Sequence, residues 1–218
     1  MRAKSAVASL SFAASLALGV ALRLGGFDGV EAQYVSSFQA LVNGAHLMPF
    51  FQAVTYLGDA YVWLLLAVLL LLAERRRPGR PLKLMAFLVV TTLATVTVKY
   101  ALMRVRPFEA YPSLVTAFGQ EDMPSYPSGH VARAAGGFTV LADGSRLLEA
   151  AFSVLIVLLA LSRVALGAHY FTDTLGASLL SYPLVPIAGR ISDRLGAALS
   201  SSKVDVSGWI HRLQPGRS

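Results

Sequence analysis

The sequence predicts an all-α integral membrane protein, a bundle of six transmembrane helices. Hydrophobic residues make up 55% of the 218 residues and charged residues only 14%, whereas soluble domains carry about 25% charged residues. Apolar windows close to the roughly 20 residues needed to cross the hydrocarbon core recur along the chain. They cover residues 5–24, 52–73, 82–103, 128–141, 147–166 and 171–189.

The first and fourth windows each have an alternative interpretation. Arg2 and Lys4 precede the first window, as in a cleavable signal peptide, but its apolar run is longer than a signal core and no clear cleavage site follows. We therefore expect a retained anchor. The fourth window is short and contains Arg133, so hydropathy alone also allows five spans.

Basic residues lie mostly in short segments that flank the apolar windows. They include the N-terminus, the segment ERRRPGRPLK after the second window, and the tail after Arg190. The net charge of +7 therefore fits the positive-inside rule better than nucleic-acid binding. We expect a multi-pass protein of the cell membrane with both termini in the cytoplasm, and residues 25–51 and 107–127 outside.

Internal repeats and long linkers are absent from the sequence, which favours one membrane domain over residues 1–190 and a loosely held cytoplasmic tail over residues 191–218. Residues 30–42 carry apolar side chains at helical spacing and are expected to form an amphipathic helix along the outer interface. The chain contains no cysteine, which excludes disulfides, thiolate metal sites and a cysteine nucleophile.

Ionisable residues gather at the outer ends of the predicted spans. Lys99 and Arg106 are seven residues apart, about two helical turns, and therefore project from one side of the third span. His169 and Asp173 begin the sixth span four residues apart and share a face. The predicted topology brings three segments to the same outer rim, with the residues Lys99, Arg106, His130, Arg163, His169 and Asp173.

Each of these residues has an ordinary structural explanation when it is taken alone. Lysine and arginine at a helix end commonly extend to lipid head groups. A histidine after Ser-Gly is often a turn residue, and a His/Asp pair at this spacing is often a plain hydrogen bond. Together they indicate function, because ionisable groups within a membrane are costly and a random scatter would not keep them on one side.

The chemistry that suits this cluster is transfer of an anionic group. Three permanent cations can neutralise a phosphate without a metal or other cofactor. The glycine of PSGH allows close approach of the backbone, and the helix that follows adds amide donors. His169 can act as a nucleophile if Asp173 orients its ring, and His130 is then placed to protonate the leaving alkoxide.

Three motifs resemble the signature of the type-2 phosphatidic acid phosphatase superfamily, which includes lipid phosphatases and vanadium haloperoxidases. They are KYALMRVRP (residues 99–107), PSGH (residues 127–130) and SRVALGAHYFTD (residues 162–173), within a similar region of about residues 50–190. The resemblance implies a six-span, metal-independent phosphatase with a phosphohistidine on His169. It further implies that His130 is the general acid, that Asp173 supports the nucleophile, and that phosphate is bound by Lys99, Arg106, Ser128, Gly129 and Arg163.

Arg133 lies outside that signature, one helical turn after His130. One interpretation is a structural ion pair with Asp59, which lies at a compatible depth in the second span. The other is an additional cation for a second phosphate or a head group. The two interpretations do not exclude each other.

A site at the outer leaflet with walls of transmembrane helix suits an amphiphile with its phosphate at head-group level. The resemblance then implies a polyprenyl diphosphate of undecaprenyl or dolichyl type, or alternatively phosphatidate or phosphatidylglycerophosphate. A non-enzymatic transporter or proton relay is a further alternative, and it predicts polar groups along a whole path. A haloperoxidase would need vanadate in the same pocket, and such proteins are soluble. The sequence does not determine the oligomeric state.

Overall fold

The computed structural model describes residues 2–74, 78–119 and 122–202, and all regular secondary structure in these ranges is helical. The prediction of an all-α fold is therefore confirmed. The helices are α1 (Arg2–Gly25), α2 (Asp28–Gly44), α3 (Met48–Val54), the 3₁₀ helix η1 (Thr55–Gly58), α4 (Ala60–Ala73), α5 (Gly79–Leu102), α6 (Pro107–Ala110), α7 (Gly129–Ala142), α8 (Arg146–Ala165) and α9 (Phe171–Ser202).

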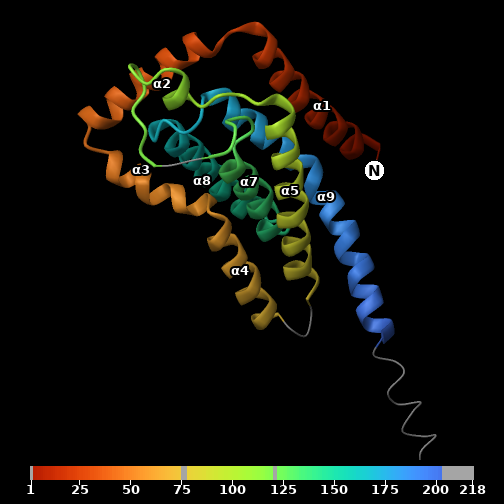
Figure 1. Ribbon diagram of the computed structural model, residues 1–218. Helices are drawn as coiled ribbons and strands as arrows, with labels where there is room; N and C mark the ends of the chain where they lie inside the picture. The colour runs from red at the N-terminus through yellow and green to blue at the C-terminus, as the bar shows by residue number, and fades with distance from the viewer. Residues whose placement is uncertain (1, 75–77, 120–121, 203–218) are drawn as a thin grey trace, which may run out of the picture.

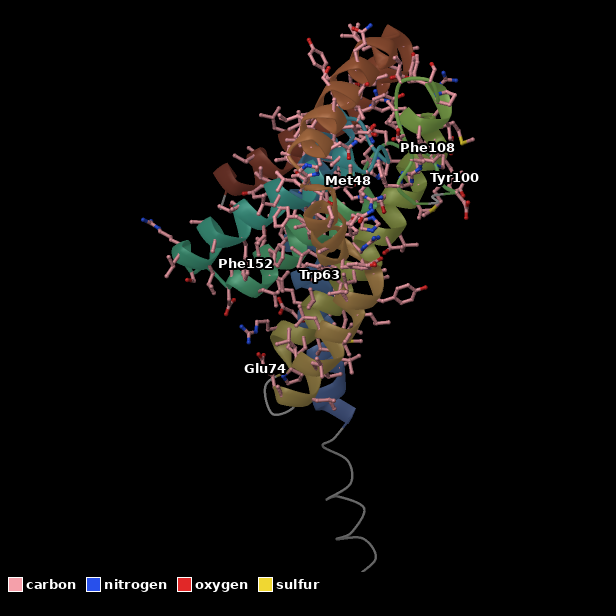
Figure 2. All side chains as sticks on the ribbon, turned by 90° about the vertical axis from the view of Figure 1, so that its left-hand side faces the viewer. Met48, Trp63, Glu74, Tyr100, Phe108 and Phe152 are labelled. Atoms are coloured by element: carbon pink, nitrogen blue, oxygen red, sulfur yellow. The ribbon has the colours of Figure 1, made fainter. Side chains whose placement is uncertain are left out.

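Helix α9 packs against α1, α5 and α7, and α8 packs mainly against α7 and α3. Figure 1 shows α2 crossing one end of this bundle obliquely, near the first turn of α9. Figure 2 shows Glu74 toward the opposite end from Tyr100 and Phe108. Short polar bonds join α1 to α9, since Ser15 Oγ donates to the carbonyl oxygen of Gly176 at 2.8 Å.

Three described helical segments are long and apolar enough to cross a membrane: Ala6–Gly25, Gly79–Ala110 and Arg146–Ala165. A fourth is obtained if Met48–Gly58 and Ala60–Ala73 form one bent span. Helix α7 has 14 residues, or about 21 Å at 1.5 Å per residue, which is shorter than the roughly 30 Å hydrocarbon core. The helical membrane class is supported, and the count of six spans stays a prediction.

The second predicted span is not one continuous helix, which corrects the expectation for residues 52–73. The chain bends by 51° between η1 and α4, and Asp59 at the break is extended, with ψ 138°. Gly58 packs directly on His130, where an added Cβ would lie 2.6 Å from the histidine Cβ. The break also leaves the carbonyl oxygen of Gly58 able to accept a hydrogen bond from Arg133 Nε at 3.0 Å.

The last helix is longer than the sixth apolar window predicted. That window ends at residue 189, whereas α9 continues to Ser202, so residues 191–202 of the predicted loose tail are helical. Hydropathy falls at Arg190, but leucine, alanine and arginine beyond it are good helix formers. The window therefore marked where the apolar segment ends and not where the helix ends. Residues 203–218 lie outside the described residues.

The helix expected at residues 30–42 is present as α2. Its side chains Ala32, Val35, Gln39 and Val42 are buried against the protein, while Tyr34 on another face is 63% exposed. The Gln39 amide nitrogen donates to the carbonyl oxygens of Thr116 at 2.8 Å and Ala165 at 3.0 Å. These bonds tie α2 to the end of α8. Its position at a membrane interface stays a prediction.

The core between α4, α5, α7 and α9 depends on two glycines of α7. A Cβ at Gly136 would lie 2.1 Å from the Phe87 ring and 2.6 Å from Ser181 Oγ, and one at Gly137 would lie 2.3 Å from the Trp63 indole. Because Phe87 is fully buried, its ring has little room to retreat. The two glycines therefore allow the helices to approach closely.

We expect Gly136→Ala to destabilise the fold, since overpacking a dense core typically costs about 1–3 kcal/mol. The measurement is thermal unfolding of the purified protein in detergent. Gly196→Ala is the matched control, because a Cβ at this position of α9 meets no atom within 4 Å, and it should unfold at or above the wild-type temperature. Equal stability of the two variants would contradict the close packing of α7.

Candidate active site

The ionisable residues predicted from the three motifs lie together at the end of the bundle near α2. They are contributed by the end of α5, the link between α5 and α6, the first turn of α7, the end of α8, and the turn before α9 together with the first turn of that helix. All but His130 are almost completely buried, with exposed fractions of 4% or less for Lys99, Arg106, Ser128, Arg163, His169 and Asp173.

Lys99 lies in the last turn of α5 and Arg106 directly before α6, so the two residues flank the short link between these helices. Met103 ends α5 in the left-handed conformation, with φ 50°, and Arg106 is extended before Pro107 opens α6. Lys99 Nζ donates to the carbonyl oxygen of Ser125 at 3.1 Å and to that of Pro124. Arg106 Nη1 donates to the carbonyl oxygen of Ala168 at 2.7 Å and lies 3.4 Å from His169 Nε2.

The two ring nitrogens of His169 face different partners. Nδ1 lies 3.4 Å from Asp173 Oδ2 and 3.4 Å from Ser125 Oγ, while Nε2 faces Arg106. Burial of the ring, reinforced by the charges of Arg106 and Lys99 and opposed by Asp173, lowers the pKa of His169 to about 3. The imidazole is therefore neutral at physiological pH, and Nε2 can present a lone pair.

The first residues of α7 complete the site. Ser128 is its N-cap, and the Ser128 amide donates to the carbonyl oxygen of Asp173 at 3.1 Å. Ser128 Oγ is buried and has no hydrogen-bond partner among the described residues. A buried hydroxyl without a partner is costly, and at the start of a helix it is suited to an anion.

The break between η1 and α4 faces this helix end. His130 Nε2 lies 3.7 Å from Asp59 Oδ1, and the positive charges of Arg163, Arg133 and Arg106 act on the same ring. Arg163 Nη1 donates to Thr55 Oγ1 at 2.7 Å. In the structure Asp59 lies beside His130, and Arg133 donates to the carbonyl oxygen of Gly58. The pairing of Asp59 with Arg133 stays a prediction.

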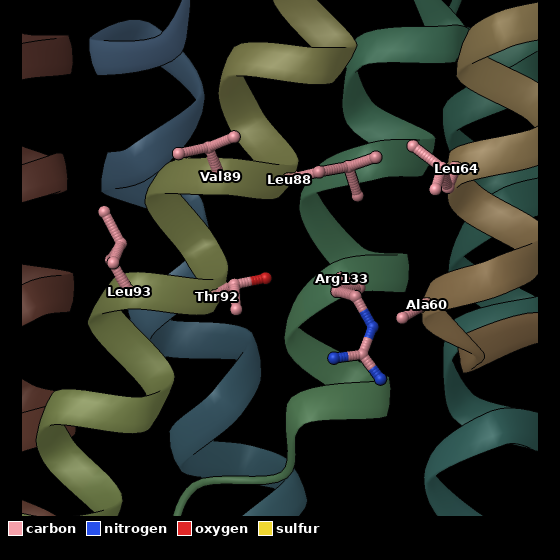
Figure 3. Close-up of a pocket in the computed structure, with 7 residues that line it drawn as sticks. All are labelled: Ala60, Leu64, Leu88, Val89, Thr92, Leu93 and Arg133. Carbon is pink, nitrogen blue, oxygen red and sulfur yellow. The ribbon is translucent and has the colours of Figure 1, made fainter.

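An apolar groove of about 340 Å³ opens beside the site, between α4, α5 and α7. Figure 3 shows Arg133 between Thr92 of α5 and Ala60 of α4. Arg133 is the charged member of the lining, whose residues are Ala60, Leu64, Leu88, Val89, Thr92, Leu93 and Arg133. An apolar surface with one cation at its edge can accept a hydrocarbon chain that carries an anionic group.

Two residues of this site were not predicted from the sequence. Ser125 Oγ donates to Asp173 Oδ2, and Arg104 Nη1 forms an ion pair with Asp173 Oδ1 at 2.6 Å. A loop serine carries no sequence signal of such a role. Arg104 had a sequence signal, because it is a third cation within the first motif. Its role could not be read from that motif, because its partners lie on α2 and α9. In the described part of the chain, no three His, Asp or Glu side chains are grouped to hold a metal.

Comparison with known sequences identifies relatives of this chain. The family model described as the PAP2 superfamily matches residues 80–195, more than half of the chain. A protein named undecaprenyl-diphosphatase from Sulfolobus acidocaldarius is 30% identical over 124 residues. This match covers 56% of the present chain and 60% of the relative.

Two solved structures resemble the fold. A transmembrane PAP2-type phosphatidylglycerolphosphate phosphatase from Bacillus subtilis superposes with a TM-score of 0.70 at 23% identity, covering 86% of this chain and 96% of the other. The LpxE protein of Aquifex aeolicus superposes with a TM-score of 0.52 at 25% identity, covering 72% and 93%. The first likeness, at this identity, concerns the fold alone.

The lowered pKa of His169 predicts a pH dependence of stability. Since the unfolded chain binds a proton at this residue near pH 6.5 and the folded chain does not, stability falls as pH falls below about 6.5. Between pH 6.5 and 4.5, the free energy of unfolding should drop by roughly 2 kcal/mol more in the wild type than in His169→Asn. The measurement is thermal unfolding at each pH in detergent.

His46→Asn is the control for this experiment, because His46 is exposed and Asn tolerates its positive φ of 56°. This variant should lose stability with falling pH as the wild type does. A His169→Asn profile parallel to that of the wild type would show that the folded protein binds the proton at His169.

Proposed function

Because the chain belongs to the PAP2 superfamily, we propose that it is a membrane lipid phosphatase that acts through a phosphohistidine on His169. The observation that carries this proposal is the orientation of the buried His169 ring, with Nδ1 toward the Asp173 carboxylate and Nε2 toward the Arg106 guanidinium. A carboxylate on one nitrogen and a cation beside the other suit a nucleophile that attacks an anion.

In the first step His169 Nε2 attacks phosphorus and the bond from phosphorus to the leaving oxygen breaks. His130 donates a proton to that oxygen. Lys99, Arg106 and Arg163, with Ser128 and the amide of Gly129, hold the phosphoryl oxygens and neutralise the charge of the transition state. The buried, unpartnered hydroxyl of Ser128 supports this assignment.

In the second step water attacks the phosphohistidine. His130 accepts the proton of the water, the bond between phosphorus and His169 breaks, and inorganic phosphate leaves. Asp173 keeps the imidazole oriented in both steps. Three permanent cations supply the positive charge that a metal would supply, so we propose that catalysis is metal-independent.

The proposed substrate is a polyprenyl diphosphate of undecaprenyl or dolichyl type. The apolar groove between α4, α5 and α7, whose lining includes Arg133 one helical turn after His130, supports a substrate with a long hydrocarbon chain. The name of the Sulfolobus acidocaldarius relative is consistent with it. Phosphatidate and phosphatidylglycerophosphate are the second candidates.

We further propose a six-span topology with the site on the extracytoplasmic side. Figure 1 places the end of α4 and the start of α5 at the end of the bundle away from α2, and the sequence ERRRPGRPLK between and around these helix ends is strongly basic. The positive-inside rule assigns that end to the cytoplasm. The site lies at the other end, where the segment from Phe108 to Gly119 contains no lysine or arginine.

His169→Asn should abolish phosphate release, because no other side chain of the site can take the role of the nucleophile. Release is measured from purified protein with farnesyl diphosphate, phosphatidate and phosphatidylglycerophosphate, each with a chelator. His46→Asn is the exposed control and should keep wild-type rates. Near-normal release by His169→Asn would overturn the assignment, and wild-type release that disappears with chelator would exclude the metal-free mechanism.

Arg133 tests the preference for a diphosphate. If the Arg133 guanidinium binds the distal phosphate, Arg133→Gln should lose about 1.5–3 kcal/mol of transition-state stabilisation on farnesyl diphosphate, because a hydrogen bond to a charged group typically contributes that much. The rate on farnesyl monophosphate should change little. The ratio of the two kcat/KM values checks this, and an unchanged ratio would leave Arg133 with a structural role.

Thermal unfolding of Arg133→Gln, Asp59→Asn and the double variant separately tests an ion pair between Arg133 and Asp59.

A further inference from the structure

Arg104 is a buried cation that the proposed mechanism does not use. It lies in the link between α5 and α6, two residues before Arg106, and is 4% exposed. The two arginines have different partners: Arg106 faces the ring of His169, whereas Arg104 faces the carboxylate of Asp173 at 2.6 Å. Arg104 therefore contacts the site from behind the His/Asp pair.

The two oxygens of Asp173 have separate sets of partners. Oδ2 accepts a hydrogen bond from the Tyr170 amide at 2.9 Å and one from Ser125 Oγ, and it lies 3.4 Å from His169 Nδ1. Oδ1 faces Arg104. Asp173 is 0% exposed, and a buried carboxylate needs a partner to remain charged. Arg104 supplies that charge and fixes the rotation of the carboxylate.

The guanidinium of Arg104 is itself held on every side. Its Cζ lies 4.0 Å above the centre of the Tyr170 ring, a cation–π distance. Arg104 Nη2 pairs with Asp28 at 2.7 Å and with Glu31, both in the first turn of α2. Thr172 Oγ1 accepts from Arg104 Nη1 at 2.8 Å and donates to Glu31 Oε1 at 2.8 Å. Arg104 thus has one defined position between α2 and α9.

We propose that Arg104 is a positioning residue of the reaction: through Asp173 it holds the ring of His169 with Nε2 toward the phosphate site. Asp28 and Glu31 hold Arg104 in turn, so the first turn of α2 belongs to the support of the nucleophile. The role rests on the phosphatase function proposed above. A purely structural role, in which Arg104 only joins α2 to α9, predicts lost stability without a change in the chemistry of His169.

The test compares Arg104→Gln and Arg104→Lys with the wild type on farnesyl diphosphate. Arg104→Gln removes the charge, and we expect kcat to fall roughly 10- to 100-fold, as for other groups that orient a reactive side chain, with KM within about threefold. Arg104→Lys keeps the charge without the fork geometry and should recover part of kcat. Arg23→Gln on the exposed end of α1 is the matched control and should keep wild-type values.

An activity-independent readout follows the His169 ring by NMR of histidine-labelled protein, with its signal identified by its loss in His169→Asn. The charged or titratable groups that face this ring are Lys99, Arg106, His130 and Asp173. Without Arg104 the Asp173 charge is uncompensated and attracts a proton to the ring, so the His169 titration should move to higher pH in Arg104→Gln. An unmoved titration with unchanged kcat would overturn the positioning role.

The two proposals fail in different ways. Absence of wild-type turnover on every lipid tested would refute the phosphatase, while the NMR titration would still decide whether Arg104 acts on His169. If Arg104→Gln does not fold, the double variant Arg104→Gln/Glu31→Gln removes one positive and one negative charge together and keeps the net charge of the cluster. A double variant with wild-type kcat and an unmoved titration would refute the role of Arg104.

Discussion

The buried carboxylate of Asp173 is the constraint on which the arrangement of the site depends. It is 0% exposed, so both of its oxygens require partners from the protein. Those partners come from three parts of the chain: Arg104 before α6, Ser125 before α7, and the adjacent His169 and Tyr170 before α9. Satisfying one charge therefore sets the relative positions of the segments that carry the motifs.

Close helix packing allows a short α7 to present its first turn to the site. Glycines at 136 and 137 admit the Phe87 and Trp63 rings, and Gly58 admits the His130 side chain. Where the helix is interrupted beside His130, the carbonyl oxygen of Gly58 accepts a hydrogen bond from Arg133 Nε, so a backbone group freed by the break has a partner within the protein, as a membrane setting requires. The interruption also brings Asp59 within 3.7 Å of the His130 ring.

Helix α2 connects the rim of the bundle to the buried pair of His169 and Asp173 through Arg104. Its first turn carries the acidic partners of Arg104, and its later Gln39 binds the backbone at the end of α8. The exposed apolar side chains on its other face, such as Tyr34 and Leu41, leave that surface suited to lipid. Helix α2, which resembles a surface helix in the sequence, thus also forms ion pairs with a buried arginine inside the protein.

The sequence by itself determined the helical membrane class, the family motifs, and the residues Lys99, Arg106, His130, Arg163, His169 and Asp173 as one cluster. The helical class follows from composition and apolar length, the cluster follows from helical spacing and the predicted topology, and the motifs follow from their resemblance to the superfamily signature. Only the tertiary structure decided the break at Asp59, the continuation of α9 to Ser202, and the contacts of Arg104 and Ser125 with Asp173. The hydrogen-bond partners of Arg104 are 68 to 76 residues away along the chain, and Ser125 is 48 residues from Asp173. Local periodicity carries no information about such distant contacts, because they form only when the folded helices bring the charges together.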